Sequence, residues 1–121
     1  MRAELEQRLA EKYPALFAGR SDPPTHSLMC FGCECGDGWY AIIDKACAEI
    51  STADPRAKLT QVKEKYGTLR MYLVTASDDA LDAADRAEEA SASVCELCGA
   101  RGYPSVKGWI MTRCDKCHGV E

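Results

Sequence analysis

The sequence contains no apolar run that approaches the roughly 20 residues of a membrane span. Its first residues, 1–6, are charged and lack the apolar core of a secretory signal, so export is not expected. Common enzyme motifs are also missing: there is no G-x-x-x-x-G-K-[ST] loop, no H-E-x-x-H and no G-x-S-x-G. These absences disfavour a membrane protein, an exported protein and an enzyme.

Acidic and basic residues are unevenly distributed along the chain. The net charge is −4, which argues against nucleic acid as the default partner. Residues 21–54 and 76–94 are acidic, whereas the segment between them, 55–75, is basic. A chain of 121 residues can bury one modest core. We therefore expect a body over residues 1–94 and a C-terminal element, 95–121, packed on it as one compact unit.

Apolar periodicity predicts an α+β fold, a small antiparallel β-hairpin packed by about three helices. A first helix is expected over residues 5–17, bent at Pro14 and ended by Gly19. Residues 20–36 should form a loop. A second helix follows, with Asp37 as its N-cap. Its expected apolar stripe is Trp39, Ile43, Ala46, Cys47 and Ile50.

The hairpin is predicted over residues 59–75, with its turn near residues 65–67. Alternation puts Leu69, Met71 and Leu73 on the core face. A third helix begins at residues 77–79, where acidic side chains complement the helix dipole. Its expected inner stripe is Leu81, Ala84, Ala87, Ala90, Ser91 and Val94.

The most informative feature is a pair of Cys-x-x-Cys motifs near the end of the chain. Cys95 and Cys98 form the first, Cys114 and Cys117 the second, and fifteen residues separate them. This spacing is typical of two knuckles that hold one structural Zn²⁺ through four thiolates. A Cys-x-x-Cys pair also occurs as a redox dithiol, but two pairs at ribbon spacing favour the metal.

The segment between the pairs, 101–113, is expected to form a hairpin, with Trp109 and Ile110 packing it back on the body. Because structural zinc contributes about 10 kcal/mol or more, the tail should be disordered without metal. His118 follows Cys117 directly and is an alternative fourth ligand. A solvent-facing histidine is the favoured interpretation.

Four further cysteines lie upstream. A second zinc at Cys30, Cys33 and Cys35, with Cys47 and His26 as further candidates, is disfavoured because thiols two residues apart rarely converge. Cys47 lies on the stripe of the second helix, where a free cysteine acts as a small apolar residue. A reactive thiolate at Cys33 or Cys35, which a hydrolase or transferase would need, is disfavoured further.

Carboxylates offer little evidence for catalysis. The acids of the third helix are interpreted as a solvated face. Strand parity places Glu64 with Val62 on the inward face, where we expect a structural pairing with an arginine or an amide, or fraying of the hairpin.

Three strings in order resemble a family of small uncharacterised proteins of tailed bacteriophages and prophages that carry a zinc-ribbon tail. They are Phe31-Gly32-x-Glu34-Cys35-Gly36-Asp37-Gly38-Trp39-Tyr40, then Gln61 to Tyr72, then Cys95-Glu96-x-Cys98-Gly99 with Gly108-Trp109 and the Cys114 pair. The resemblance covers most of the chain, although Cys30 and Cys33 depart from the family pattern. It implies a compact α+β body with a zinc ribbon, made in a bacterial cytoplasm, and it supplies no activity.

The expected function is therefore non-enzymatic binding of a host bacterial protein, with inhibition of a defence system as the expected role. The candidate surface is the polar hairpin face: Lys63, Lys65, Arg70 and Tyr72. The acidic third helix and the tip over residues 103–107 are further candidates. The alternative is a nucleic-acid-binding or transcription-regulatory zinc ribbon, since basic residues lie beside an aromatic on the hairpin.

Overall fold

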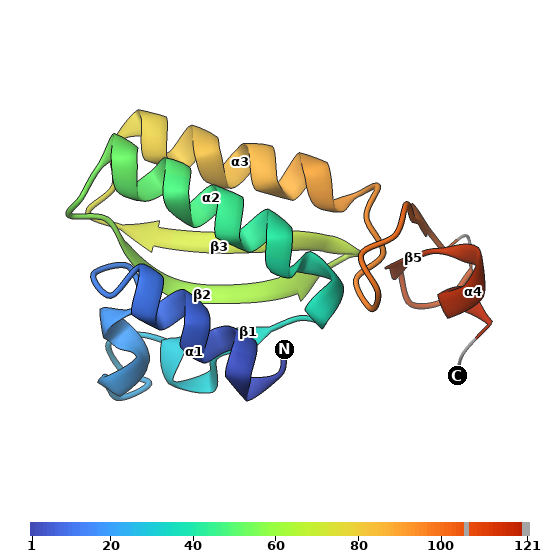
Figure 1. Cartoon of the computed structure of the whole chain (residues 1–121), viewed down its shortest axis with the longest axis horizontal. Helices are drawn as coiled ribbons and strands as arrows, with labels where there is room; N and C mark the ends of the chain where they lie inside the picture. Colours follow the sequence, from blue (N-terminus) through green and yellow to red (C-terminus); the bar gives the residue numbers. More distant parts are fainter. Residues whose placement is uncertain (106, 120–121) are drawn as a thin grey trace.

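The computed structural model describes residues 1–105 and 107–119. Two long helices, α2 (Tyr40–Ala53) and α3 (Asp78–Ser91), lie side by side over one face of a sheet (Figure 1). The sheet has the order β1-β2-β3. Strands β2 and β3 are antiparallel, and the two-residue β1 pairs parallel to β2. The predicted α+β class is confirmed, and the parallel strand is an addition that the sequence did not indicate.

Shorter elements complete the architecture. The helix α1 lies in front of β2 in Figure 1, and a second, two-stranded sheet, β4-β5, lies beyond one end of the main sheet. The bounds of the strands and remaining helices are α1 (Ala3–Lys12), β1 (Cys33–Glu34), β2 (Lys58–Lys65), β3 (Thr68–Val74), β4 (Tyr103–Pro104), β5 (Thr112–Arg113) and α4 (Asp115–His118). Three short 3₁₀ turns are η1 (Ala18–Ser21), η2 (Met29–Phe31) and η3 (Asp37–Trp39).

The core lies between the sheet and its helices. It includes the predicted stripe of α2, every member of which is buried. The alternation on β3 is also confirmed: Leu69 and Met71 are buried and Leu73 is half-buried. The largest fully buried side chains of the body are Trp39, Leu9, Leu16, Met29, Ile43, Ile50, Leu59, Leu69 and Val62.

Helix boundaries differ from the expectation at two places. Helix α1 ends at Lys12, because Tyr13 precedes a proline and leaves the α region (φ −129°, ψ 62°). Gly19 is not a C-cap; it lies within η1. Asp37 does not cap α2 either, since its carboxylate accepts hydrogen bonds from the backbone amide and the guanidinium of Arg2, both at 2.8 Å.

Helix α3 begins as predicted and faces the core differently. Ser77 is its N-cap and accepts a hydrogen bond from the amide of Ala80. The expected inward position of Leu81 is wrong: this side chain is 43% exposed, and Ala80 and Ala83 are buried instead. The helix packs against both α2 and β3, so its buried face is turned toward the groove between them.

The β2–β3 hairpin turns at Tyr66 and Gly67, which both have positive φ (53° and 81°). Such a two-residue turn matches the right-handed twist of the strands. The half-buried Glu64 accepts a hydrogen bond from the Gly67 amide at 2.7 Å, which is the structural pairing with an amide. We call residues 95–105 and 107–119 the C-terminal lobe, and in Figure 1 it lies at this end of the sheet. Among the described residues, no helix has the length and apolar character that a bilayer crossing requires.

Candidate metal centre

The four C-terminal cysteines converge at one point. The sulfur atoms of Cys95, Cys98, Cys114 and Cys117 all lie within 4.8 Å of one another. The Cys98 and Cys114 sulfurs are 3.6 Å apart. A tetrahedral ion with Zn–S bonds of about 2.3 Å would separate its ligands by about 3.8 Å. The cluster can therefore hold a metal ion, and its donor set is that of a structural zinc site.

Each cysteine pair is positioned by a tight local turn. In the first, the Cys95 amide donates to the Ala100 carbonyl (2.7 Å) and the Gly99 amide donates to the Cys95 carbonyl (2.9 Å). Gly99 has φ +83°, a conformation that favours glycine. In the second, Cys114 precedes α4, and the His118 amide donates to its carbonyl at 2.9 Å. Each turn directs its own two sulfurs toward a common centre.

The thiols of the cluster do not share one pKa. Burial disfavours the Cys95 thiolate, but backbone hydrogen bonds from Cys114 and Cys98 outweigh it and lower the pKa of Cys95 to about 6. A side-chain hydrogen bond to Cys114 raises the pKa of Cys117 to about 12. A cation at the centre would favour the thiolate form of all four. With four sulfur ligands, such an ion has no open position for water or substrate.

His118 lies beside the cluster and outside its ligand set. Its Nε2 is 2.9 Å from the Tyr103 carbonyl oxygen, and its ring centroid is 4.7 Å from that of Tyr103. The Tyr103 hydroxyl donates to Asp115 at 2.5 Å. His118 is therefore half-buried, against the expectation of a solvent-facing side chain, and it joins α4 to β4.

The first cysteine turn (residues 95–99, called the first knuckle) packs against the loop that precedes α2. The Gly36 amide donates to the Glu96 carboxylate (2.9 Å), and the Gly38 amide donates to the Glu96 carbonyl (2.8 Å). A Cβ on Gly36 would overlap the carbonyl of Glu96, and one on Gly38 would overlap the carbonyl of Cys95. Gly36 and Gly38 therefore allow the backbone of this loop to contact the backbone of the turn that carries Cys95 and Cys98.

Two more bonds lie at the junction of the body and the C-terminal lobe. The indole N–H of Trp39 donates to the Val94 carbonyl at 2.8 Å. The hydroxyl of Thr112, which is buried, donates to the Gly67 carbonyl at 2.6 Å. Burial raises the pKa of Glu96, whose carboxylate lies within this junction. The metal cluster is thus held against the α2 loop on one side and the β2–β3 turn on the other.

The upstream cysteines do not join a metal cluster. Within residues 1–105 and 107–119, the C-terminal four are the one group of at least three His, Cys, Asp or Glu side chains with ligating atoms close enough for an ion. Cys33, Cys35 and Cys47 are buried and Cys30 is exposed. Burial raises the pKa of Cys33 to about 12, and it raises the pKa of Cys35 and Cys47 further. These thiols are protonated at neutral pH, contrary to what a nucleophile requires.

The four residues predicted to contact a partner lie on β2 and β3, and one of their charges is paired. Lys63 and Arg70 are cross-strand neighbours, and Tyr72 is 39% exposed. The Arg70 guanidinium lies 3.5 Å from the Glu88 carboxylate of α3, so one of the basic groups on this face is already paired.

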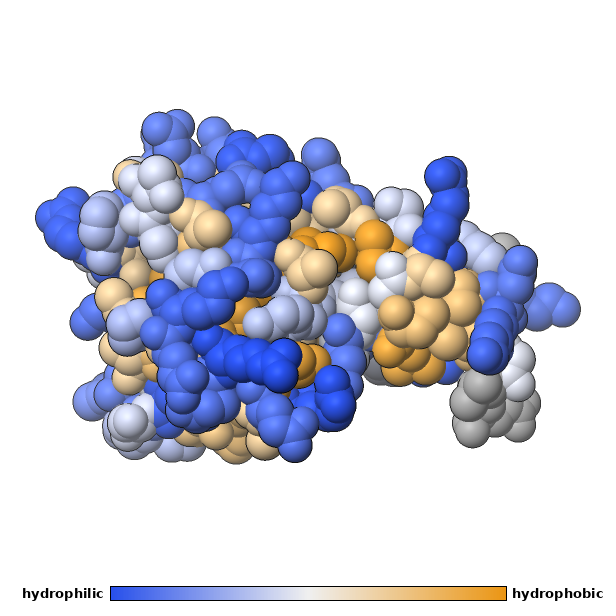
Figure 2. Space-filling model, viewed as in Figure 1, coloured by the Kyte–Doolittle hydropathy of each residue, from blue (hydrophilic) through white to orange (hydrophobic). Residues whose placement is uncertain are grey.

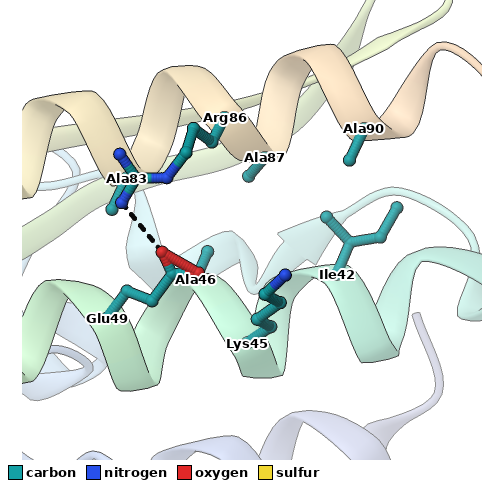
Figure 3. Close-up of a pocket in the computed structure, with 8 residues that line it drawn as sticks. All are labelled: Ile42, Lys45, Ala46, Glu49, Ala83, Arg86, Ala87 and Ala90. Atoms are coloured by element: carbon teal, nitrogen blue, oxygen red, sulfur yellow. Dashed lines mark hydrogen bonds and ion pairs between the residues drawn. The ribbon is translucent and has the colours of Figure 1, made fainter.

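A small cavity lies between two helices of the body. It has a volume of about 100 Å³ and lies between α2 and α3, where Ala46, Ala83 and Ala87 face each other and Arg86 reaches Glu49 at 2.8 Å (Figure 3). Ligand pockets are usually about 300–1,000 Å³, so this space is better explained as a packing groove between alanine-rich helices.

Two exposed aromatic side chains, Tyr66 and Trp109, line one cavity that the sequence did not indicate. Trp109 was expected to pack on the body and is instead 77% exposed, and Tyr66 is 69% exposed. Ile110 does contact the body: a Cβ on Gly67 would lie 2.9 Å from its Cγ2. The contact between the β2–β3 turn and residue Ile110 joins segments far apart along the chain, so local sequence patterns do not indicate it.

Comparisons with protein-family models, curated proteins and solved structures gave no match for this chain.

Proposed function

We propose that this protein is a non-enzymatic binding protein, stabilised by one zinc ion, that engages a host bacterial protein. The observation that carries the proposal is the closed set of four sulfur ligands, which would stabilise a lobe and leave no site for substrate. The exposed Trp109 of that lobe and the exposed Tyr66 of the β2–β3 turn support a role in protein contacts, because tryptophan and tyrosine dominate binding energy at interfaces.

We further propose the cytoplasm of a bacterium as its location, as an accessory protein of a phage or prophage, and a defence system as its target. This part rests on the resemblance of the three sequence strings alone. Expression in a bacterium with an active defence system, scored by the efficiency of phage plating, tests it. Unchanged plating across the defence systems tested would contradict the inhibitory role.

The binding role is tested by capture from a bacterial lysate with tagged protein, purified with its metal and after chelation. Elemental analysis should find one zinc per chain. We expect a host protein to be captured by the metal-bound form and to be lost after chelation, since the lobe should unfold without its ion. Failure of the metal-bound form to retain any host protein would end this proposal.

Nucleic-acid binding is the second candidate, favoured by the Lys65 ammonium lying 5.7 Å from the centroid of the Tyr66 ring, next to Lys63 on β2. Such binding would lose affinity steeply with salt, by about one log unit per log unit of salt for each phosphate contacted. Gel shifts at two salt concentrations distinguish it from protein binding.

A further inference from the structure

An apolar face is formed by two turns from distant parts of the sequence. We define the turn face as Tyr66 from the β2–β3 turn and Trp109 with Ile110 from the turn between β4 and β5. These residues and Gly108 line a cavity of about 190 Å³. Ile110 is 42% exposed despite its contact with Gly67. In Figure 2 apolar surface gathers on and beside the C-terminal lobe, while hydrophilic side chains cover much of the body.

Hydrogen bonds fix the backbone of the turns that carry these side chains. The Ser105 hydroxyl donates to the Trp109 carbonyl (2.9 Å) and accepts from the Met111 amide (3.1 Å). The bond from Thr112 to Gly67 fixes this turn against the other one. A turn whose backbone is already fixed loses less conformational entropy on binding than a mobile one. The turn face is thus arranged for contact, and a cavity of this size suits one side chain better than a small-molecule ligand.

Three lysines lie within three residues of Tyr66 or Trp109 along the chain, and one carboxylate, that of Glu64, lies at the β2–β3 turn. Lys65 precedes Tyr66 and is exposed, Lys63 lies on the same side of β2, and Lys107 precedes Gly108. In the part of the chain that the structure describes, none of these three lysines takes part in an ion pair. This local charge contrasts with the net charge of −4. A partner that covers the turn face would therefore gain from negative charge around an apolar centre.

We propose that the turn face is the docking surface for an acidic segment of a partner protein, which inserts one apolar side chain between Tyr66, Trp109 and Ile110. The inference rests on the proposed binding function and names the chemistry of the partner. The three lysines steer the segment and the aromatic pair anchors it.

A labelled peptide with a central leucine flanked by Asp and Glu tests the docking surface by fluorescence anisotropy with the zinc-loaded full chain. Comparison probes are the same peptide with Lys flanks, the same acidic peptide with Ser in place of Leu, and a single-stranded RNA oligonucleotide. We expect the acidic leucine peptide to bind at least about ten-fold more tightly than either other peptide, and more weakly as salt rises.

Two variants locate the binding. Trp109→Ala and Lys65→Glu should each weaken the acidic leucine peptide by about ten-fold or more. The controls are Leu81→Ala, which removes an exposed apolar side chain from α3, and Lys45→Glu, which reverses an exposed charge on α2. Both controls should bind like the parent. Zinc content and circular dichroism establish that each variant is folded.

The proposal is overturned by parental affinity in Trp109→Ala, by equal binding of the Lys-flanked peptide, by preference for the RNA, or by no binding of any peptide. Capture from a lysate distinguishes failure of the docking surface from failure of the proposed binding function. If a captured host protein still binds Trp109→Ala, the docking surface is wrong and the binding function stands. If the parent captures nothing, the binding function fails, and the peptide titration judges the turn face independently.

Discussion

Replacement of Gly38 by alanine tests whether the metal centre depends on the loop that precedes α2. Gly38 lies in η3 with an ordinary backbone conformation, so helix propensity alone predicts that Gly38→Ala stabilises the protein by up to about 1 kcal/mol. The packing predicts the opposite sign. An alanine Cβ would overlap the carbonyl of Cys95 and lie 2.6 Å from the Gly99 nitrogen, both backbone atoms of the first knuckle.

The loss in the free energy of unfolding can be estimated because these backbone atoms cannot move away from the new Cβ on their own. Because a rotamer change cannot move backbone, the knuckle must shift away from the loop. Overpacking costs about 1–3 kcal/mol, and the shift also weakens the hydrogen bond from Gly38 to Glu96, worth about 1 kcal/mol. We expect a net loss of about 2–3 kcal/mol in the free energy of unfolding, with weaker metal binding because the displaced turn carries Cys95.

Urea unfolding followed by circular dichroism measures the first quantity, and competition with a chromophoric chelator measures the second. Gly119→Ala is the matched control. Gly119 also lies next to the cluster, but the nearest atom to a Cβ there is the Lys116 carbonyl at an ordinary 3.5 Å, so this variant should match the parent in both assays. A Gly38→Ala protein with parental stability and parental metal affinity would refute the docking argument.

Other predictions concern the ligands and the helix contacts. Cys114→Ser should lower metal affinity by more than the roughly 10–100-fold typical of changes around a ligand, while Cys30→Ser, at an exposed position, should retain full metal content by elemental analysis. The Asp44 carboxylate accepts from Lys12 at 2.7 Å; burial opposes its charge, but this bond and one from Tyr13 outweigh burial and lower the pKa of Asp44. Asp44→Ala should therefore cost about 1 kcal/mol above pH 3.8, the ordinary pKa of Asp. In urea titrations, the difference from the parent should decrease as the pH falls from 3.8 through the lowered pKa of Asp44. Ser77→Ala removes the N-cap of α3 and should lower the unfolding free energy by about 1 kcal/mol in the same assay.

The local pattern of the sequence was enough for the features that depend on neighbours along the chain. The alternation at Leu69 and Met71 places β3, and the apolar spacing from Trp39 to Ile50 places α2, because each periodicity matches one backbone geometry. The two Cys-x-x-Cys pairs indicate the four members of the metal cluster, since each turn brings its own two sulfurs together. Leu81 shows where this reasoning stops: its spacing fits an inner stripe, but α3 packs on two neighbours at once and buries Ala80 and Ala83 instead.

The elements and the ligand chemistry can thus be predicted from the chain alone, because they arise from local backbone geometry and side-chain type. How those elements meet is visible only in the folded protein. Folding places Gly36 and Gly38 against Glu96, sixty residues or so along the chain, and it brings the turn at Tyr66 beside Trp109. Such contacts join segments far apart along the chain and produce no repeating pattern in the sequence. They depend on the shapes of surfaces that exist only after the body has folded.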